Sequence, residues 1–360
     1  MRFHTNLHTP VRVLFLGLKY DYGDPSRGYS YEYINFFGTL ARMDGVSATL
    51  FPFDEIMRQH GRDEMNRQLL NMVDTVQPDI CFFFLFTDEI KKETIRAITE
   101  KGKSITLNWF ADDHWRFPEF TRHWAPLFHW SVTTDREAVE KYSAIGCHNV
   151  ILSQWGFNHF LYKPVTTSQE YNVTFVGQAH SNRKKIVQAL KRSGVPIECW
   201  GKGWHSGRLS QEEMVSLYSK SKINLNFTES SISWRPKPLL KSLFSRRADD
   251  SLHLKTPAET AAHLRTLLAR RRAQIKGRNF EIPGAGGFLL TQYAACLEEY
   301  FVPGRDIAVF STNEELMEKI QHFLTHEEER ETVRRSGQER AIREHTFLSR
   351  FNSIFQKILK

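Results

Sequence analysis

Residues 276–291 gather the residue types that bind a diphosphate and a ribose. Lys276 and Arg278 stand just before the carboxylate of Glu281. Three glycines follow it, namely Gly284, Gly286 and Gly287. Glycine lets the backbone approach a ligand closely and offers N–H donors to an anion, and a carboxylate can accept hydrogen bonds from two sugar hydroxyls. The same pattern is also typical of a buried turn whose glycines serve only tight packing.

A second candidate phosphate site follows Gly177, which ends an apolar segment. Arg183 and Lys184 come next, at the start of a predicted helix. A helix N-terminus with cations beside it suits a phosphate, although an ordinary surface loop with solvated cations has the same sequence. The chain has neither GxGxxG nor GxxxxGK[ST], so neither a dinucleotide fingerprint nor a P-loop is supported.

Two carboxylates and an imidazole, those of Asp112, Asp113 and His114, follow the apolar segment 104–109. At the end of a strand, such groups can act as a general base and as anchors for hydroxyls, so we predict these three as catalytic residues. Helix capping by the carboxylates is the structural alternative. A metal site is disfavoured, because three adjacent loop residues rarely converge on one ion. The absence of GxSxG and HExxH leaves esterase and zinc-protease chemistry without support.

Length and composition indicate a globular protein with two domains. The 360 residues are 41% hydrophobic and 25% charged, as in ordinary soluble domains. No apolar run approaches the roughly 20 residues of a membrane-spanning helix, and the first residues lack the apolar core of a signal peptide. The four cysteines form no CxxC pair, which disfavours a zinc site or a disulfide framework. We therefore expect a reducing, cytoplasmic setting.

Strand-like and helix-like segments alternate along the whole chain. The predicted strands are 11–17, 47–51, 79–86, 104–109, 130–134, 149–152, 172–177, 196–201, 223–227, 278–281 and 306–310. Helices are predicted between them, for example at 31–43, 88–101, 183–193 and 210–220, and Thr325 is expected to cap a C-terminal helix. Such alternation predicts parallel sheets with right-handed crossovers.

The pattern restarts after residue 165, so the predicted fold is α/β with two Rossmann-like lobes. The expected parts are an acceptor-side lobe at 1–165, a nucleotide-sugar-binding lobe at 166–345 with an insertion at 232–274, and a C-terminal helix at 346–360. Ligands of such sheets bind beyond the carboxyl ends of the strands, and the cleft shared by the lobes is the expected site. The loop at 155–158 is expected either to line that cleft or to supply aromatic packing where the lobes join.

The positive charge is concentrated in one segment. Net charge is +8 for the chain, whereas residues 235–278 hold twelve Lys or Arg and three acids. Thr256 and Pro257 start a predicted basic amphipathic helix there. Either this helix packs on its own lobe, or it makes peripheral contact with an anionic membrane or another polyanion. Because the rest of the chain is nearly neutral, nucleic-acid binding is not expected.

Taken together, these segments resemble the CgeB-like (spore-maturation type) family, a branch of the group 1 glycosyltransferases with the GT-B fold. The resemblance rests on Phe280–Thr291, on Tyr300–Phe310 with the following Asn313–Leu316, and on Glu328–Thr346. Looser similarity covers Val173–Gly177, Trp200–Trp204 and Trp109–Asp113.

The resemblance implies that the C-terminal lobe holds most of a nucleoside-diphosphate sugar. Glu281 then corresponds to the residue that binds the ribose hydroxyls, Arg278 and the glycines lie at the diphosphate, and Gly177 with Arg183 faces the donor. Many members carry an acid eight positions before this glutamate, where this chain has Ala273, so a retaining mechanism is not implied. The resemblance also implies that no metal or other cofactor is needed.

The leading hypothesis is a cytoplasmic glycosyltransferase, peripheral at the inner membrane face, that transfers a sugar to a glycan, lipid-linked or protein acceptor. A sugar-nucleotide epimerase of the same fold would release an altered nucleotide sugar without any acceptor. A non-catalytic protein that binds polyanions through 235–278 would show salt-dependent binding and no donor hydrolysis.

Overall fold

The computed structural model describes residues 10–229, 244–246, 252–254, 256 and 272–360. The chain divides into two compact units. Among the described residues, the first unit comprises 10–154, 244–246, 252–254, 256 and 350–360, and the second comprises 155–229 and 272–349. The division thus falls after Gln154, and the end of the chain returns to the first unit.

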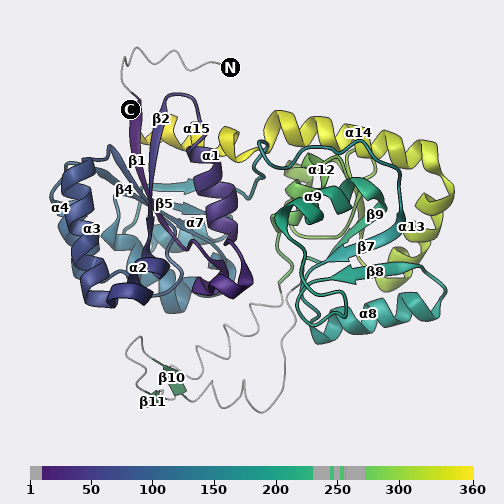
Figure 1. The fold of residues 1–360 in the computed structure, drawn as a ribbon, viewed down its shortest axis with the longest axis horizontal. Helices are drawn as coiled ribbons and strands as arrows, with labels where there is room; N and C mark the ends of the chain where they lie inside the picture. Colours follow the sequence, from purple (N-terminus) through teal and green to yellow (C-terminus); the bar gives the residue numbers. More distant parts are fainter. Residues whose placement is uncertain (1–9, 230–243, 247–251, 255, 257–271) are drawn as a thin grey trace. The chain divides into compact units, whose positions relative to one another are not determined.

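The first unit contains a six-stranded parallel sheet with the order β2-β1-β3-β4-β5-β6 (Figure 1). Its strands are β1 (Val11–Gly17), β2 (Val46–Pro52), β3 (Ile80–Phe83), β4 (Ile105–Phe110), β5 (Trp130–Thr133) and β6 (Val150–Leu152). All six strands predicted here are confirmed, because their apolar residues are buried by layers on both faces. The strand predicted at 79–86 is shorter than expected and ends at Phe83.

Helices cover both faces of this sheet. The α-helices are α1 (Gly38–Leu40), α2 (Phe53–His60), α3 (Arg62–Val76), α4 (Lys92–Glu100), α5 (Asp113–Arg116), α6 (Arg122–Trp124), α7 (Ala138–Ser143) and α15 (Phe347–Ile358). Shorter turns of 3-10 or π-helix are η1 (Asp21–Gly23), η2 (Pro25–Arg27), η3 (Glu32–Phe37), η4 (Phe117–Thr121) and η5 (Ala125–Leu127). Helix α3 was not predicted, although Met65, Leu69 and Val73 give it an apolar stripe.

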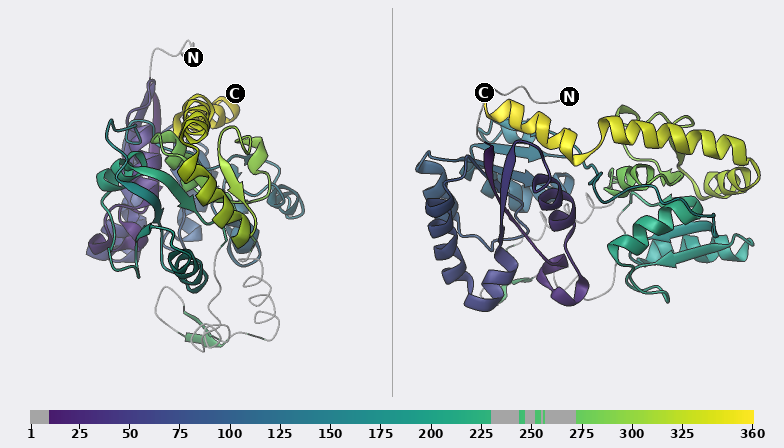
Figure 2. Two further views of the ribbon diagram at one scale, coloured as in Figure 1. Left: turned by 90° about the vertical axis from the view of Figure 1, so that its right-hand side faces the viewer. Right: turned by 45° about the horizontal axis from the view of Figure 1, so that its top comes forward.

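The two faces of the sheet differ in their side chains. Leu14 and Phe83 belong to an apolar cluster that includes α3 and α4. The opposite face is aromatic, because the ring of Phe82 lies 5.6 Å from Phe15 and 5.6 Å from Phe351 of α15. In the right-hand view of Figure 2, the yellow helix at the C-terminus lies along this unit. The C-terminal helix is therefore part of the first unit's core.

The second unit contains a five-stranded parallel sheet with the order β13-β12-β9-β7-β8. Its strands are β7 (Tyr171–Val176), β8 (Ile197–Trp200), β9 (Ser221–Asn226), β12 (Leu289–Gln292) and β13 (Ala308–Phe310). Its helices are α8 (Ser181–Arg192), α9 (Gln211–Lys220), α12 (Arg278–Gly284), η6 (Leu297–Glu299), α13 (Asn313–Thr325) and α14 (Glu327–Glu344). The Ser210 capping box predicted for α9 is present.

Two element predictions in this unit are wrong. Residues 278–281 begin helix α12 instead of forming a strand, and the strand of this region is β12, which follows the glycines. Thr325 ends α13 and donates to carbonyls of that helix, so it does not cap α14. A threonine cap is present one helix earlier. Thr312 caps the start of α13, where its hydroxyl accepts from the N–H of Glu315.

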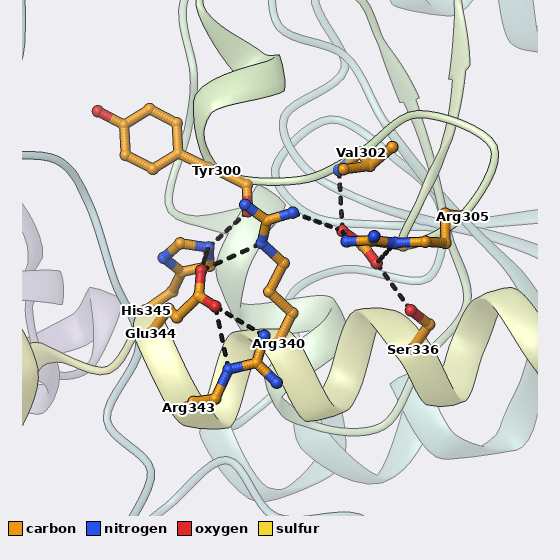
Figure 3. Close-up of polar contacts among 9 residues, drawn as sticks. Tyr300, Val302, Arg305, Ser336, Arg340, Arg343, Glu344 and His345 are labelled. Atoms are coloured by element: carbon orange, nitrogen blue, oxygen red, sulfur yellow. Dashed lines mark hydrogen bonds and ion pairs between the residues drawn. The ribbon is translucent and has the colours of Figure 1, made fainter.

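Helix α14 is tied to the loop after η6 by a buried carboxylate. Asp306 accepts hydrogen bonds from Arg305, Ser336 and Arg340, and Figure 3 shows these three side chains converging. Burial opposes the charge of Asp306, but these donors hold the pKa of its carboxyl well below the usual range. At the end of α14, His345 is buried and lies 2.6 Å from the carbonyl oxygen of Tyr300.

The insertion predicted at 232–274 falls mostly outside the described residues. Its described parts include an antiparallel pair, β10 (Phe244–Arg246) and β11 (Leu252–Leu254). The basic amphipathic helix expected after Thr256 lies outside the described part of the chain. No helix within the described ranges is both long and apolar enough to cross a bilayer.

The packing of α14 leads to the first prediction. Alanine normally replaces glycine inside a helix with a gain of about 1 kcal/mol. At Gly337, however, an added Cβ would lie 2.1 Å from the carbonyl oxygen of Asp306. We expect Gly337→Ala to lower the free energy of unfolding by roughly 1–3 kcal/mol, measured by urea denaturation. Glu339→Ala, at an exposed position of the same helix, is the control, and a Gly337→Ala protein as stable as wild type would contradict the packing argument.

Candidate functional site

The candidate site lies at the carboxyl edge of the second unit's sheet. The chain leaves β7 toward β8 on one side, whereas β9 leads to β12 on the other. Neighbouring strands whose connections diverge in this way leave a crevice beyond their carboxyl ends, where ligands bind. Gly177 follows β7 at this point, and residues 227–229 follow β9.

Arg183 of α8 bridges these two strand ends. Its guanidinium donates to the carbonyl oxygens of Gln178 at 3.3 Å and Phe227 at 3.2 Å. No carboxylate of the described residues pairs with it, and its Nε is buried with no hydrogen-bond partner among them. Burial lowers the pKa of Arg183 to about 10. The group is still a cation at neutral pH, and a bound anion would offset the cost of burying its charge.

A buried polar network fixes the start of α12 above the same edge. Asn226 at the end of β9 donates to Asn279 at 3.1 Å and to Thr291 of β12 at 3.1 Å. Asn279 in turn donates to the Thr291 hydroxyl at 3.0 Å and accepts from the N–H of Lys276 at 2.8 Å. Because all three side chains are buried, each bond is costly to lose. The loop at 276–279 is therefore held to the ends of β9 and β12.

Glu281 lies one turn into α12 and is fully buried. Its Oε2 pairs with the guanidinium of Arg278, whereas its Oε1 has no hydrogen-bond partner among the described residues. The hydroxyl of Tyr218 is likewise buried and has no partner there. Burial and then the charge of Glu281 raise the pKa of the Tyr162 hydroxyl, so Tyr162 stays a neutral hydrogen-bonding group. These groups form a buried polar patch that can still accept and donate hydrogen bonds.

The ion pair also determines the state of Arg278. Burial disfavours its charge, but the carboxylate of Glu281 raises the pKa of the guanidinium above its usual value. The two side chains therefore carry opposite charges that largely neutralise each other. Of the two predicted phosphate-binding arginines, Arg183 is therefore the one that no carboxylate of the described residues neutralises. Lys184 is exposed on α8, and Lys276 is half-buried before α12.

The three predicted diphosphate glycines are explained by protein packing. An added Cβ at Gly284 would lie 2.5 Å from the ring of Phe157, and one at Gly287 would lie 2.8 Å from the amide of Asn224. Gly286 has φ +76, which favours glycine whatever the ligand. All three are buried. The alternative of a turn that needs glycine for tight packing therefore accounts for them, and direct contact with a diphosphate stays a prediction.

The predicted catalytic residues lie in the first unit, after β4. Asp113 is fully buried and accepts hydrogen bonds from Thr121 at 2.6 Å, Thr133 at 2.6 Å and Tyr142 at 2.9 Å. Three hydroxyls therefore hold its carboxylate between three elements of the unit. This geometry favours a positioning role for Asp113 over proton transfer to a substrate.

Asp112 and His114, the neighbours of Asp113 in sequence, lie in different surroundings. Asp112 is half-buried, and its backbone takes the left-handed conformation with φ 60, which aspartate tolerates better than most residues. Its side chain does not cap α5, so the capping alternative does not hold for it. His114 is buried in the first turn of α5. The loop at 155–158 packs within the second unit, where Phe157 pairs with the backbone around Thr346.

Several residues of the candidate site were missed by the sequence interpretation. Asn226, Asn279 and Thr291 are ordinary polar residues, and Tyr162 and Tyr218 stand far from the glycine-rich segment in sequence. One signal was available, since polar residues alternate with apolar ones along 223–227, in a strand otherwise expected to be buried on both faces.

Comparisons with known proteins indicate a family and a fold that this chain resembles. Residues 183–356 match the family model described as "Glycosyl transferase-like". This match begins at Arg183 and includes α12 and α14. No curated protein matches the chain by sequence. The CgeB-like subgroup is a narrower statement and stays a prediction.

Solved structures establish the fold. Sucrose-phosphate synthase from Thermosynechococcus elongatus has a TM-score of 0.59 at 9% identity, covering 97% of this chain and 99% of that one. Anabaena Alr3699/HepE in complex with UDP has a TM-score of 0.57 at 10% identity, covering 96% and 100%. A putative UDP-N-acetylglucosamine 2-epimerase from Listeria monocytogenes has a TM-score of 0.51 at 11% identity, covering 97% and 98%. The chain has the two Rossmann-like domains of the GT-B fold.

The second prediction tests the effect of burial on the carboxyl of Asp113. Burial raises the pKa of its carboxyl to about 6. The unfolded chain releases this proton near pH 4, so the native state loses stability as pH rises from about 4 to 6. Asparagine does not titrate, so Asp113→Asn should lack this loss of stability. Between about pH 4 and 6, the unfolding free energy of the wild type should therefore fall by about 2–3 kcal/mol more than that of the variant. Urea unfolding at several pH values measures it, with Asp112→Asn as control. Matching profiles for the variant and the wild type would contradict the raised pKa of Asp113.

Proposed function

We propose that this protein is a glycosyltransferase that moves a sugar from a nucleoside-diphosphate sugar to an acceptor. Three lines of support agree, namely the family match over 183–356, the GT-B fold, and the polar site at the carboxyl edge of the second sheet. The observation that carries the proposal is the buried Oε1 of Glu281, which has no partner among the described residues. A buried carboxylate oxygen without a donor is costly, and a ribose hydroxyl would satisfy it.

The nucleoside is proposed to bind against α12. Glu281 would accept from a ribose hydroxyl through Oε1, while its Oε2 stays paired with Arg278. The hydroxyl of Tyr218, which also has no partner among the described residues, can serve the same ligand. The Anabaena Alr3699/HepE structures are complexes with UDP, with UDP and glucose, and with UDP-glucose, so UDP and UDP-glucose are the first donors to test.

The diphosphate is proposed to lie against Arg183. This guanidinium is held at the ends of β7 and β9 by main-chain carbonyls, and no carboxylate of the described residues neutralises it. Negative charge on the diphosphate grows as the glycosidic bond breaks, and a preorganised cation stabilises that charge without requiring a bound metal. Arg278 fits this role less well than the sequence suggested, because Glu281 already neutralises it.

Two alternatives make different predictions. A sugar-nucleotide epimerase shares the fold, as the Listeria monocytogenes structure shows, and it would convert the nucleotide sugar without an acceptor. Product analysis by mass spectrometry and NMR after incubation with UDP-sugars separates the two activities. The polyanion-binding alternative rests on 235–278, most of which lies outside the described residues. Salt-dependent binding to anionic vesicles without donor turnover would favour it.

The third prediction concerns Glu281. We expect Glu281→Gln to weaken UDP binding roughly 10- to 150-fold, because a hydrogen bond to a charged group is worth about 1.5–3 kcal/mol. Isothermal titration calorimetry measures the Kd. The amide keeps the shape of the side chain and an oxygen that can accept from Arg278, although the ion pair is lost, whereas alanine would remove the acceptor as well. Glu212→Gln, at an exposed position on α9, is the matched control. An unchanged Kd in folded Glu281→Gln would remove Glu281 from the nucleotide site.

The fourth prediction concerns Arg183. We expect Arg183→Ala to lower kcat for the donor more than it raises KM, because a cation at the leaving group acts most strongly in the transition state. Arg183→Lys keeps the charge and should recover part of the loss. Donor hydrolysis or transfer at several donor concentrations separates kcat from KM. A rise in KM with kcat unchanged would mean that Arg183 binds only the ground state.

A further inference from the structure

The loop after β1 in the first unit is closed and rigidly anchored. Tyr20 and Tyr29 form an antiparallel bridge, and the N–H of Ser30 donates to the carbonyl of Lys19 at 2.9 Å. The buried carboxylate of Asp54 accepts from the N–H groups of Lys19 at 2.9 Å and Tyr20 at 3.0 Å. Residues 19–30 therefore form a loop whose ends are bonded to each other and whose start is bonded to Asp54.

This loop lies at the point where the strand connections of the first sheet diverge. The chain passes from β1 to β2 on one side, and β3 leads to β4 on the other. The ring of Tyr22, from the loop after β1, lies 5.4 Å from the ring of Phe86, from the loop after β3. Tyr22 therefore spans the position at which an open parallel sheet binds its ligands.

Tyr22 is held in an unusual state. Its side chain is 57% exposed, and its backbone has φ 54 and ψ 28, a conformation that costs a bulky residue free energy. Such strain persists where the surrounding structure enforces it, and it concentrates at ligand sites. Arg27 lies 4.2 Å from the centre of the Tyr22 ring. The backbone conformation of Tyr22 therefore costs free energy, and burial of its largely exposed ring does not offset that cost.

Tyr29 is the second exposed aromatic residue of the same loop. Its side chain is 54% exposed, and its ring is stacked with Tyr20 at 5.8 Å and with Tyr33 at 4.7 Å. Tyr33 is stacked in turn with Phe37 at 5.7 Å. Tyr33 and Phe37 belong to helix η3, so the exposed ring of Tyr29 packs against a helix. Two large exposed aromatic side chains on one loop are more than isolated surface residues.

The charges around these rings favour a neutral ligand with many hydroxyls. Residues 19–30 contain two cations and two acids, so the loop carries no net charge. Arg27 pairs with Asp21 at 2.9 Å, and both side chains are partly exposed. An ion pair of this kind presents donors and acceptors side by side, which suits hydroxyl groups because each hydroxyl both donates and accepts. A polyanion would gain little from a surface of zero net charge.

We propose that the loop at 19–30 binds a carbohydrate ring, whose apolar C–H face contacts the side chain of Tyr22 while Arg27 and Asp21 bond its hydroxyls. Resting on the proposed function, this ring is the sugar of the acceptor, which makes the acceptor a glycan or glycoconjugate. The surface lies within the first unit, whereas Glu281 and Arg183 lie in the second. The two sites can therefore be tested separately.

Saturation-transfer NMR on the full-length protein tests the proposal, with the methyl α- and β-glycosides of glucose, galactose, mannose and N-acetylglucosamine as probes. UDP is added in excess to occupy the nucleotide site. The decisive variant is Tyr22→Gly, because glycine adopts a φ of 54 without strain and removes the ring together with its contacts to Phe86 and Arg27. Tyr22→Phe keeps the ring. Ile342→Ala removes an apolar side chain that is 50% exposed in the second unit and is the matched control.

We expect at least one glycoside to bind the wild-type protein, roughly tenfold weaker binding in Tyr22→Gly, and nearly unchanged binding in Tyr22→Phe and Ile342→Ala. Wild-type protein that binds none of the probes would overturn the proposal, and so would equal binding by Tyr22→Gly. A UDP thermal-shift assay keeps the two hypotheses apart. Glycoside binding without any UDP binding would refute the proposed transferase but support this surface. UDP binding together with unchanged glycoside binding by Tyr22→Gly would support the proposed transferase and refute this surface.

Discussion

The requirement that buried polar groups be paired fixes the position of the second unit's candidate site. Asn226, Asn279 and Thr291 come from β9, from α12 and from β12, and each is buried. They satisfy one another only if α12 starts directly above the ends of the two strands. Any other placement would leave a buried amide unpaired, at a cost of about 1–3 kcal/mol. The position of Glu281, one turn later, follows from this constraint.

Two buried carboxylates illustrate how the same chemical group serves different purposes. Asp113 has both oxygens engaged by hydroxyls of its own unit, so it holds elements together. Glu281 uses one oxygen for Arg278, and the other has no partner among the described residues. Burial alone would make both candidates for catalysis or binding. Counting the donors around each oxygen separates them, because a satisfied carboxylate has little to gain from a ligand.

Much of the fold follows from local sequence patterns, whereas much of the candidate site does not. The apolar segments of both sheets predicted ten of the strands, because burial on two faces leaves a continuous apolar run. The segment 278–281 was mistaken for a strand since four residues are too few to show a helical period. The partners of Asp113 stand 8, 20 and 29 residues away in sequence, and those of Asn226 stand 53 and 65 residues away. Contacts of this kind depend on the tertiary fold, so no local pattern reveals them.

The two units offer different chemistry at equivalent places in their sheets. The second presents a partly buried cation and an incompletely paired carboxylate, which suit a charged ligand with hydroxyls. The first presents exposed aromatic rings beside a neutral ion pair, which suit an uncharged ring. In the first unit, Asp54 holds Lys19 and Tyr20 by their backbone N–H groups, and this anchoring maintains the strained conformation of Tyr22. A parallel sheet fixes only where its strands end, and the loops that follow them decide what can bind there.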